Sequence, residues 1–393
     1  MASRSERRNV CVVGVGHADG PHATGRQPYQ LIAQGFGRAL ADAGLTKDRV
    51  DGLASAGHTG MHEVAVAEYL GLRPAWLDST SCGGSSFEFH AHHAYRAIEA
   101  GDVDVVAICY GSNQLTANGR TLGTGGAGPR GMQPPGPMKY EFPTGLTLVG
   151  AYAMAARRHM HEFGTTPEQL ASISVQMREH AARNPSAMYR DPITVDDVLA
   201  SPLIADPLHK LDCCVISDGG CCVLLAAEEI ATDLRWSSNP VFVRGASGGT
   251  THHSIQGMND MTRTAAAEAG RRAFAAAGIR PADVDVFCSY DSFTYTVLVM
   301  LEDLGFAPKG EGGAFVADGN LRLGGALPTN PDGGGLSCTH PGMRGLFLIA
   351  EATRQLRHDA GDSQVRDAAV AVCNGSGGWL STQGTVVLGT EAR

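Results

Sequence analysis

The chain has 393 residues, 43% of them apolar and 18% charged, which is the composition of an ordinary globular protein with room for two domains. A net charge of −9, with no basic stripe, argues against nucleic acid as a partner. No run of about 18 apolar residues exists, so no membrane-spanning helix is expected. The apolar stretch Val10–Val15 is too short for the core of a signal peptide.

The ten cysteines include two adjacent pairs, Cys213-Cys214 and Cys221-Cys222. Because no secretion signal is recognisable, we interpret them as buried thiols in a reducing compartment, not as a disulfide framework. No Cys-x2-Cys pair faces a second pair at the spacing of a zinc site, so no metal is expected. The sequence therefore predicts a cytoplasmic protein.

The first elements predicted along the chain alternate between strand and helix. Val10–Val15 predicts a buried strand, and residues 37–51 predict the end of an amphipathic helix, a glycine stop and a turn into the next strand. A helix from about Gly84 to Ala100 then leads into a strand over Val103–Cys109. Residues 113–145 are rich in Gly, Pro, Thr and Met and lack periodicity. A loop of that length is usually a lid, a partner-contact region or an oligomer arm.

The later part of the chain repeats this pattern at a constant offset of 234 residues. Residues 271–285 (RRAFAAAGIRPADVD) match residues 37–51 (GRALADAGLTKDRVD). Any two α/β units share some likeness, but a register kept over the whole segment favours duplication. A helix from about Gly342 to Arg357, followed by a strand over Ala368–Cys373, extends the match. The sequence therefore predicts two similar α/β halves.

The repeat also predicts where the halves begin and end. We expect an N-terminal half over residues 1–235, with a loop or lid insertion at about 113–210, and a C-terminal half over residues 236–393. Val50 and Val284 are expected to lie on equivalent strands.

The first candidate for chemistry is Cys82, in the segment DSTSCGGSS at 78–86, between a strand and a helix. A cysteine at a helix N-terminus feels the positive end of the helix dipole, which lowers the pKa of its thiol. The neighbouring glycines would let a thioester approach backbone N–H donors. The alternative is a packing role, which is the commoner one for a cysteine at a tight turn.

Three further polar and glycine-rich motifs also lie at the ends of predicted elements. They are CSYDSF at 288–293 with Tyr290, GLSCTHPGMRG at 335–345 with His340, and VCNGSGG at 372–378 with Cys373. A single His or Cys at such a place is a weak signal. Four motifs spread over two duplicated halves predict one site where the element ends converge.

Together these motifs resemble the landmarks of the thiolase superfamily. That family has a nucleophilic Cys at a buried helix start, an Asn-Glu-Ala-Phe strand end, a Gly-His-Pro motif and a Cys-x-Gly-x-Gly motif. Cys82, Tyr290–Phe293, Thr339–Pro341 and Cys373–Gly377 occupy these places. The resemblance covers the whole chain and implies a five-layer αβαβα fold made of two duplicated halves. It is closest to the sterol-carrier-protein-type thiolases and the thiolase-like aldolases that act on steroid side chains, through LDCCVISDG (211–219) and LEDLGF (301–306).

The thiolase resemblance implies an acyltransferase that makes or breaks a carbon–carbon bond in an acyl-coenzyme A thioester. Cys82 would take up the acyl group, His340 would lower the pKa of that thiol, and Cys373 would move the α-proton of the substrate. The reaction would be thiolysis of a 3-oxoacyl-CoA or acyl transfer. Gly375, Ser376 and Gly377 would bind the coenzyme A thioester, and His340 with the backbone N–H groups around Gly375 would hold enolate charge.

Two departures from the thiolase pattern support an alternative. Aligning the nucleophile turn on Gly84-Ser85-Ser86 places Ser81, not Cys82, at the nucleophile position, and Tyr290 replaces the family's Asn. Both features resemble the aldolase branch, which implies a retro-aldol lyase acting on a 3-hydroxyacyl-CoA with a branched or steroid side chain. Tyr290 would then accept the hydroxyl proton, while Arg344 stands where a second tyrosine is expected. A third possibility is a non-catalytic lipid-carrier or scaffold subunit.

The resemblance has further implications outside these motifs. His58, in GHTG after a predicted strand, matches a place where some thiolase-like acyltransferases carry a base; an exposed loop histidine is the alternative. The family resemblance also implies a homodimer and a small partner subunit with an oligonucleotide/oligosaccharide-binding barrel and a zinc ribbon. The acyl group of the substrate is not identified by the sequence.

Overall fold

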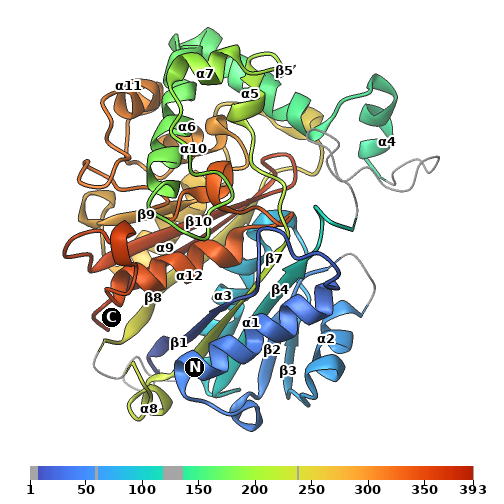
Figure 1. The fold of residues 1–393 in the computed structure, drawn as a ribbon, viewed down its shortest axis with the longest axis vertical. Helices are drawn as coiled ribbons and strands as arrows, with labels where there is room; N and C mark the ends of the chain where they lie inside the picture. The colour runs from blue at the N-terminus through green and yellow to red at the C-terminus, as the bar shows by residue number, and fades with distance from the viewer. Residues whose placement is uncertain (1–7, 58–60, 118–135, 237–238, 393) are drawn as a thin grey trace.

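The computed structural model describes residues 8–57, 61–117, 136–236 and 239–392 (Figure 1). No helix within these ranges is long and apolar enough to cross a membrane. The elements are β1 (Val10–His17), α1 (Pro28–Ala43), β2 (Gly52–Ser55), α2 (His62–Leu70), β3 (Trp76–Asp78), α3 (Ser86–Ala100), β4 (Val105–Ser112), α4 (Met138–Glu141), α5 (Leu148–Phe163), α6 (Pro167–Ala181), α7 (Val195–Ala200), β5 (Leu203–Ala205), β6 (Leu208–His209), β7 (Gly219–Ala227), α8 (Glu228–Ala231), β8 (Val241–Thr250), α9 (Ala266–Ala277), β9 (Val286–Ser289), α10 (Thr294–Asp303), α11 (Gly312–Ala317), α12 (Gly345–Leu356), β10 (Val370–Gly377) and β11 (Thr382–Gly389).

The main sheet shows the duplication directly. Its strand order is β3-β2-β4-β7-β1-β8-β11-β10-β9, so the order β2-β4-β7-β1 of the first half is mirrored by β8-β11-β10-β9 in the second. The two halves meet where β1 and β8 pair antiparallel, with Cys11 opposite Phe242. The predicted fold of two duplicated halves is therefore confirmed.

The 234-residue offset also holds for individual elements. β2 and β9 differ by 234 residues at both ends, and α1 and α9 differ by 234 at their last residue. Both helices end at a glycine with a left-handed backbone, Gly44 at φ 75° and Gly278 at φ 70°, a conformation that glycine adopts without a steric cost. Val50 and Val284 lie at equivalent places, each two residues before its strand.

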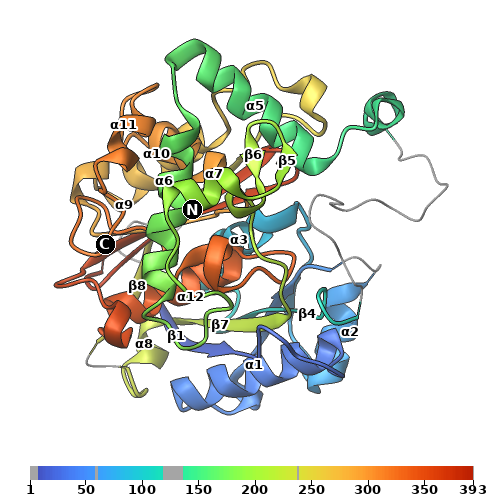
Figure 2. The ribbon, with the colours of Figure 1, turned by 45° about the horizontal axis from the view of Figure 1, so that its top comes forward.

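Five layers follow from which helices contact which strands (Figures 1 and 2). α3 and α12 each contact strands of both halves and form the middle layer. α1 covers β1, β7 and β4 on the outside of the first half, and α9 covers β8 and β11 on the outside of the second. Because helices cover both faces, the strands are almost continuously apolar and buried, as β7 shows along its whole length.

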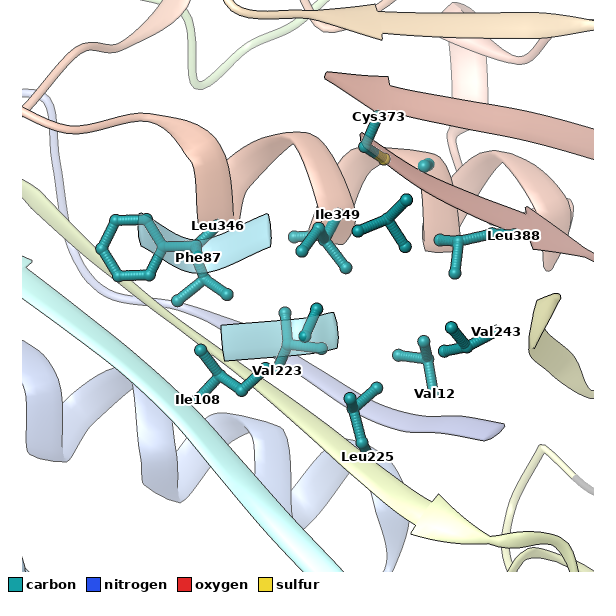
Figure 3. Close-up of a cluster of buried hydrophobic side chains, with 14 of the residues drawn as sticks. Val12, Phe87, Ile108, Val223, Leu225, Val243, Leu346, Ile349, Cys373 and Leu388 are labelled. Carbon is teal, nitrogen blue, oxygen red and sulfur yellow. The ribbon is translucent and has the colours of Figure 1, made fainter. Parts of the chain in front are cut away.

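The middle layer contains the largest apolar cluster (Figure 3). Phe87 of α3 and Leu346 and Ile349 of α12 pack there against strand residues such as Val223 of β7 and Leu388 of β11. The start of α3 and the loop before α12, which carry two of the predicted motifs, are thereby anchored in one core.

The predicted insertion at 113–210 lies between β4 and β7, and its described part is mostly helical. α5 and α6 pack on α10 of the second half, and α6 also packs on α11. The stretch predicted as an aperiodic loop, 113–145, ends in the short helix α4, and its residues 118–135 lie outside the described part of the chain. We propose that the second half begins at residue 236, because β8 is the first strand of that half.

Candidate functional site

Tyr290 and His340, predicted from separate motifs, are in direct contact. Tyr290 follows β9, and its backbone N–H donates to the Asn374 carbonyl at 2.9 Å. Its Oη lies 3.1 Å from Nε2 of His340, and the two rings meet edge to face at 86°. The backbone N–H of His340 donates to Ser217 Oγ at 2.9 Å. Both side chains are buried, at 4% and 8% exposure, so their contact forms in an environment of low dielectric constant.

Buried charges hold the loop that presents His340. The Asp291 carboxylate accepts the N–H groups of Gly335 at 2.7 Å and of Leu336 at 3.0 Å, within the π-helical turn Gly334–Cys338. Arg344 donates to Asp332 at 2.6 Å and to the Thr339 carbonyl at 2.8 Å. Arg344, which stands where a second tyrosine was expected, is therefore a completely buried support of the His340 loop.

The protonation state of Tyr290 bears on its expected role as the acceptor of the hydroxyl proton. A phenol that accepts a proton directly would need a lowered pKa, but burial raises the pKa of Tyr290 well above 10, and the electrostatic effects of Cys214 and Tyr152 raise it further. Arg344 contributes only a weaker lowering through its backbone. Tyr290 is therefore a neutral phenol at physiological pH, able to donate a proton and able to accept one only while it gives up its own.

The turn that carries Cys82 lies against Tyr290 and the end of β10. A Cβ on Gly84 would overlap the Tyr290 phenol, and one on Gly83 would lie 2.8 Å from the backbone nitrogen of Gly378. Cys82 is half-buried, and its Sγ lies 3.5 Å from Ser85 Oγ. Gly83 and Gly84 thus allow β10 and Tyr290 to approach this turn closely. Ser81, the alternative nucleophile position, is exposed.

Gly84→Ala tests this close approach. The added methyl group would overlap the phenol and move it, and since misplacement by about 1 Å can cost on the order of 10² in rate, we expect kcat to fall on the order of 10-fold for a partial shift. The matched control is Gly37→Ala on α1, where an added Cβ meets nothing within 4 Å. That variant should keep its kcat and gain up to about 1 kcal/mol of stability. Equal kcat values in both variants would show that Tyr290 does not need this space.

Cys373 lies in the apolar cluster of the middle layer (Figure 3). It is fully buried, and its thiol donates to the Leu348 carbonyl of α12 at 3.4 Å. Side chains alternate along a strand, so Cys373 shares the inner face of β10 with Gly375 and Gly377, and Ser376 faces the other way, where it accepts from Gln383. The role of Cys373 as a proton shuttle stays a prediction, and no contact described here supports it.

The predicted binding residues Gly375, Ser376 and Gly377 are part of β10 and pair with β11. The strand continues past its predicted end at Cys373 to Gly377, and Gly378, with φ 63°, follows it. A role for the three residues in binding coenzyme A stays a prediction. His58 lies outside the described residues.

Two site residues were not predicted from the sequence. Tyr152 of α5 donates to the Gly378 carbonyl at 3.2 Å, and its ring lies 4.5 Å from that of Phe293. The Cys214 N–H donates to the Ser292 carbonyl at 2.9 Å. Tyr152 comes from the insertion, where no motif singled it out, and Cys214 was interpreted only as a buried thiol although it is half-exposed.

Comparison with known proteins gives the family. Residues 247–390 match the family model "Thiolase C-terminal domain-like". A steroid side-chain-cleaving aldolase of Thermomonospora curvata is 35% identical, over 97% of this chain and 98% of the relative. An acetyl-CoA acetyltransferase of Methanothermobacter thermautotrophicus is 33% identical, over 94% and 97%. A solved structure of an Ltp2-ChsH2(DUF35) aldolase superposes with a TM-score of 0.87 at 31% identity, covering 97% of each chain. The chain therefore belongs to the thiolase superfamily of enzymes.

Proposed function

We propose that this protein is a retro-aldol lyase that cleaves the Cα–Cβ bond of a 3-hydroxyacyl-CoA with a branched or steroid side chain. The observation that carries the proposal is the 3.1 Å contact between the Tyr290 phenol and His340, with the phenol packed on Gly84. A retro-aldol reaction needs a group that removes the hydroxyl proton and a group that stabilises the enolate. The paired side chains can supply both.

The protons can be followed through the pair. Tyr290 takes the proton of the substrate 3-hydroxyl while it passes its own proton to Nε2 of His340, so that no free phenolate forms. As the Cα–Cβ bond breaks, the hydroxyl carbon becomes a carbonyl, and the bonding electrons move to the thioester as an enolate. The imidazolium of His340 stabilises the enolate and returns a proton that completes the shortened acyl-CoA. The raised pKa of Tyr290 suits this relay, because the phenol is neutral at its start and at its end.

The comparisons support this proposal at the level of the relatives' activities. One relative with 35% identity over nearly the whole chain is a steroid side-chain-cleaving aldolase. Another, 34% identical over 88% of the chain, is a 17-hydroxy-3-oxo-4-pregnene-20-carboxyl-CoA lyase of Mycobacterium tuberculosis. Coenzyme A would be part of substrate and product, and we propose no further cofactor.

Thiolysis is the second candidate, favoured by the position of Cys82. The half-buried cysteine directly precedes the helical turn Gly83–Ser85 and α3, and the first N–H groups of a helix, which lack partners within the helix, favour a thiolate or an oxyanion at such a place. In that reaction Cys82 would carry the acyl group and His340 would activate it. The acetyl-CoA acetyltransferase relatives support this candidate.

Cys82→Ser distinguishes the two candidates. For the lyase, Cys82 only supports the turn, and we expect kcat to change by no more than about threefold, because the substitution keeps the size of the side chain and a polar atom near Ser85. For the thiolase, loss of the nucleophile would abolish turnover. Steady-state kinetics with a 3-hydroxyacyl-CoA and with a 3-oxoacyl-CoA plus coenzyme A provide the measurement. Loss of all activity in Cys82→Ser would refute the lyase proposal.

We further propose that the chain works in the cytoplasm as a homodimer with a small partner subunit. The free state of all ten cysteines is compatible with a reducing compartment. The structural likeness to an aldolase composed of Ltp2 and ChsH2(DUF35) supports the partner. Light scattering of the purified protein, alone and with its co-purifying subunit, tests both assemblies.

A further inference from the structure

Glu88 is a buried carboxyl group that the proposed chemistry does not use. It lies in the first turn of α3, four residues after Gly84, and is completely buried. Neither of its carboxyl oxygens has a hydrogen-bond partner among the residues that the structure describes. A buried polar group without a partner costs about 1–3 kcal/mol, so its presence beside a site calls for a specific role.

Three glycines from three elements make room for this carboxyl group. A Cβ on Gly375 of β10 would overlap one of its oxygens, and a Cβ on Gly345 of α12 would lie 2.5 and 2.8 Å from the two oxygens. A Cβ on Gly384 of β11 would lie 2.5 Å from Cβ of Glu88. We call Gly345, Gly375 and Gly384 the glycine cradle. It lets the backbone of α12 and β10 approach the carboxyl group and the backbone of β11 approach Cβ of Glu88.

No charge offsets the burial of Glu88 in the cradle. Burial raises its pKa from 4.5 to about 8, against a weaker lowering effect from its own backbone N–H. Arg344, the residue before Gly345, turns toward Asp332 and Asp291. Cys373 of β10 donates to the Leu348 carbonyl. Tyr290, which follows β9, has its hydroxyl in hydrogen-bond contact with His340. On β11, the backbone of Gly384 approaches Glu88.

The cradle lies directly behind Tyr290. A Cβ on Gly345 would overlap the Gly84 carbonyl oxygen and both carboxyl oxygens of Glu88, so these three oxygens surround the same small space. The other side of Gly84 is covered by the Tyr290 phenol. A carboxylate in the cradle would direct negative charge at the Gly84 carbonyl, which already carries partial negative charge, whereas a neutral carboxyl group would not. Movement of Gly84 in response would displace Tyr290.

We infer that Glu88 is a positioning residue that must be neutral: uncharged, it fills the glycine cradle and fixes Gly84 behind Tyr290, and its ionisation in alkaline solution switches the enzyme off. This inference rests on the proposed function where it concerns turnover. The ionisation itself has an independent readout, the pH dependence of stability.

The stability measurement compares the wild type with Glu88→Gln, which keeps the shape of the side chain and cannot ionise. Below pH 4.5 Glu88 is neutral in both the folded and the unfolded state. As pH rises from 4.5 to about 8, the unfolded chain loses the proton that the folded chain keeps, so the wild type loses stability; above about 8 the loss levels off. We expect the Tm of Glu88→Gln to exceed that of the wild type by a gap that widens by several degrees between pH 5 and pH 8. A gap that does not change with pH would overturn the inference.

The activity measurement compares the pH profiles of kcat. Wild-type kcat should fall roughly tenfold per pH unit above about 8, and Glu88→Gln should retain its kcat there. Glu99→Gln on the same helix, whose carboxylate pairs with Arg96, is the matched control and should fall like the wild type. The same alkaline fall in Glu88→Gln and the wild type would overturn the positioning role.

Two further outcomes remain decisive. If neither Glu88→Gln nor Glu88→Met folds, a neutral side chain does not satisfy the cradle and the inference fails. If no 3-hydroxyacyl-CoA is cleaved at any pH, the proposed function fails, and the widening Tm gap still decides whether Glu88 is neutral in the folded protein.

Discussion

Replacing Tyr290 with phenylalanine is expected to lower kcat for a 3-hydroxyacyl-CoA by a factor on the order of 10² or more. The change removes only the hydroxyl group that lies 3.1 Å from His340, and with it the path from the substrate hydroxyl to the imidazole. A positioned acid–base group typically contributes 10²–10⁴ in rate, which sets the expected size. The ring is kept, so packing on Gly84 is retained and stability should fall by only about 1 kcal/mol.

The matched control is Tyr295→Phe. Tyr295 of α10 is as deeply buried as Tyr290, but its hydroxyl donates to the Met261 carbonyl and not to His340. This variant should lose about the same stability, measured by urea unfolding, and keep its kcat. If both tyrosine variants keep wild-type kcat, Tyr290 is a packing residue and the proton path is wrong.

Replacing His340 with alanine is expected to lower kcat by about 10²–10³. In the proposed relay, His340 accepts the proton and then places positive charge beside the enolate, and removal of one such electrostatic donor costs about that factor. His340→Gln keeps a hydrogen-bonding side chain but cannot become charged, so it should be nearly as slow as His340→Ala. A His340→Gln variant with wild-type kcat would show that a hydrogen bond alone suffices.

The double variant Tyr290→Phe with His340→Ala tests whether the two residues act as one unit. Groups that act in a single relay are strongly non-additive, because loss of either member already breaks the path. We expect the double variant to be no more than a few-fold slower than the slower single variant. Multiplied rate losses would indicate two independent roles.

The two-half fold could be predicted from the sequence because the duplicated segments still resemble each other. A constant 234-residue offset preserves the helix stop glycines Gly44 and Gly278, and each half repeats the same buried strands. Tyr290 and His340 were found for a related reason: both lie where strands or loops end in polar and glycine-rich motifs, and element ends of such a fold converge.

The surroundings of the site could not be predicted, because they depend on packing between segments distant in the chain. Whether Cys373 faces the core depends on the strand continuing to Gly377, which the glycine-rich sequence did not indicate. The high pKa of Tyr290 results from burial among several elements. In the sequence, Glu88 has the pattern of a solvent-facing residue of an amphipathic helix. Its burial depends on three glycines that are distant in the chain, which the sequence around Glu88 does not indicate.

The most direct test of the lyase proposal is the reaction of the purified protein, together with any subunit that co-purifies, on a 3-hydroxyacyl-CoA branched at C3, in deuterated water and without free coenzyme A. We expect equal amounts of a ketone and a shortened acyl-CoA, the latter carrying one deuterium at its α-carbon, as detected by mass spectrometry. Cleavage that occurs only with a 3-oxoacyl-CoA plus free coenzyme A, together with an acyl group trapped on Cys82, would contradict the proposal and establish thiolysis.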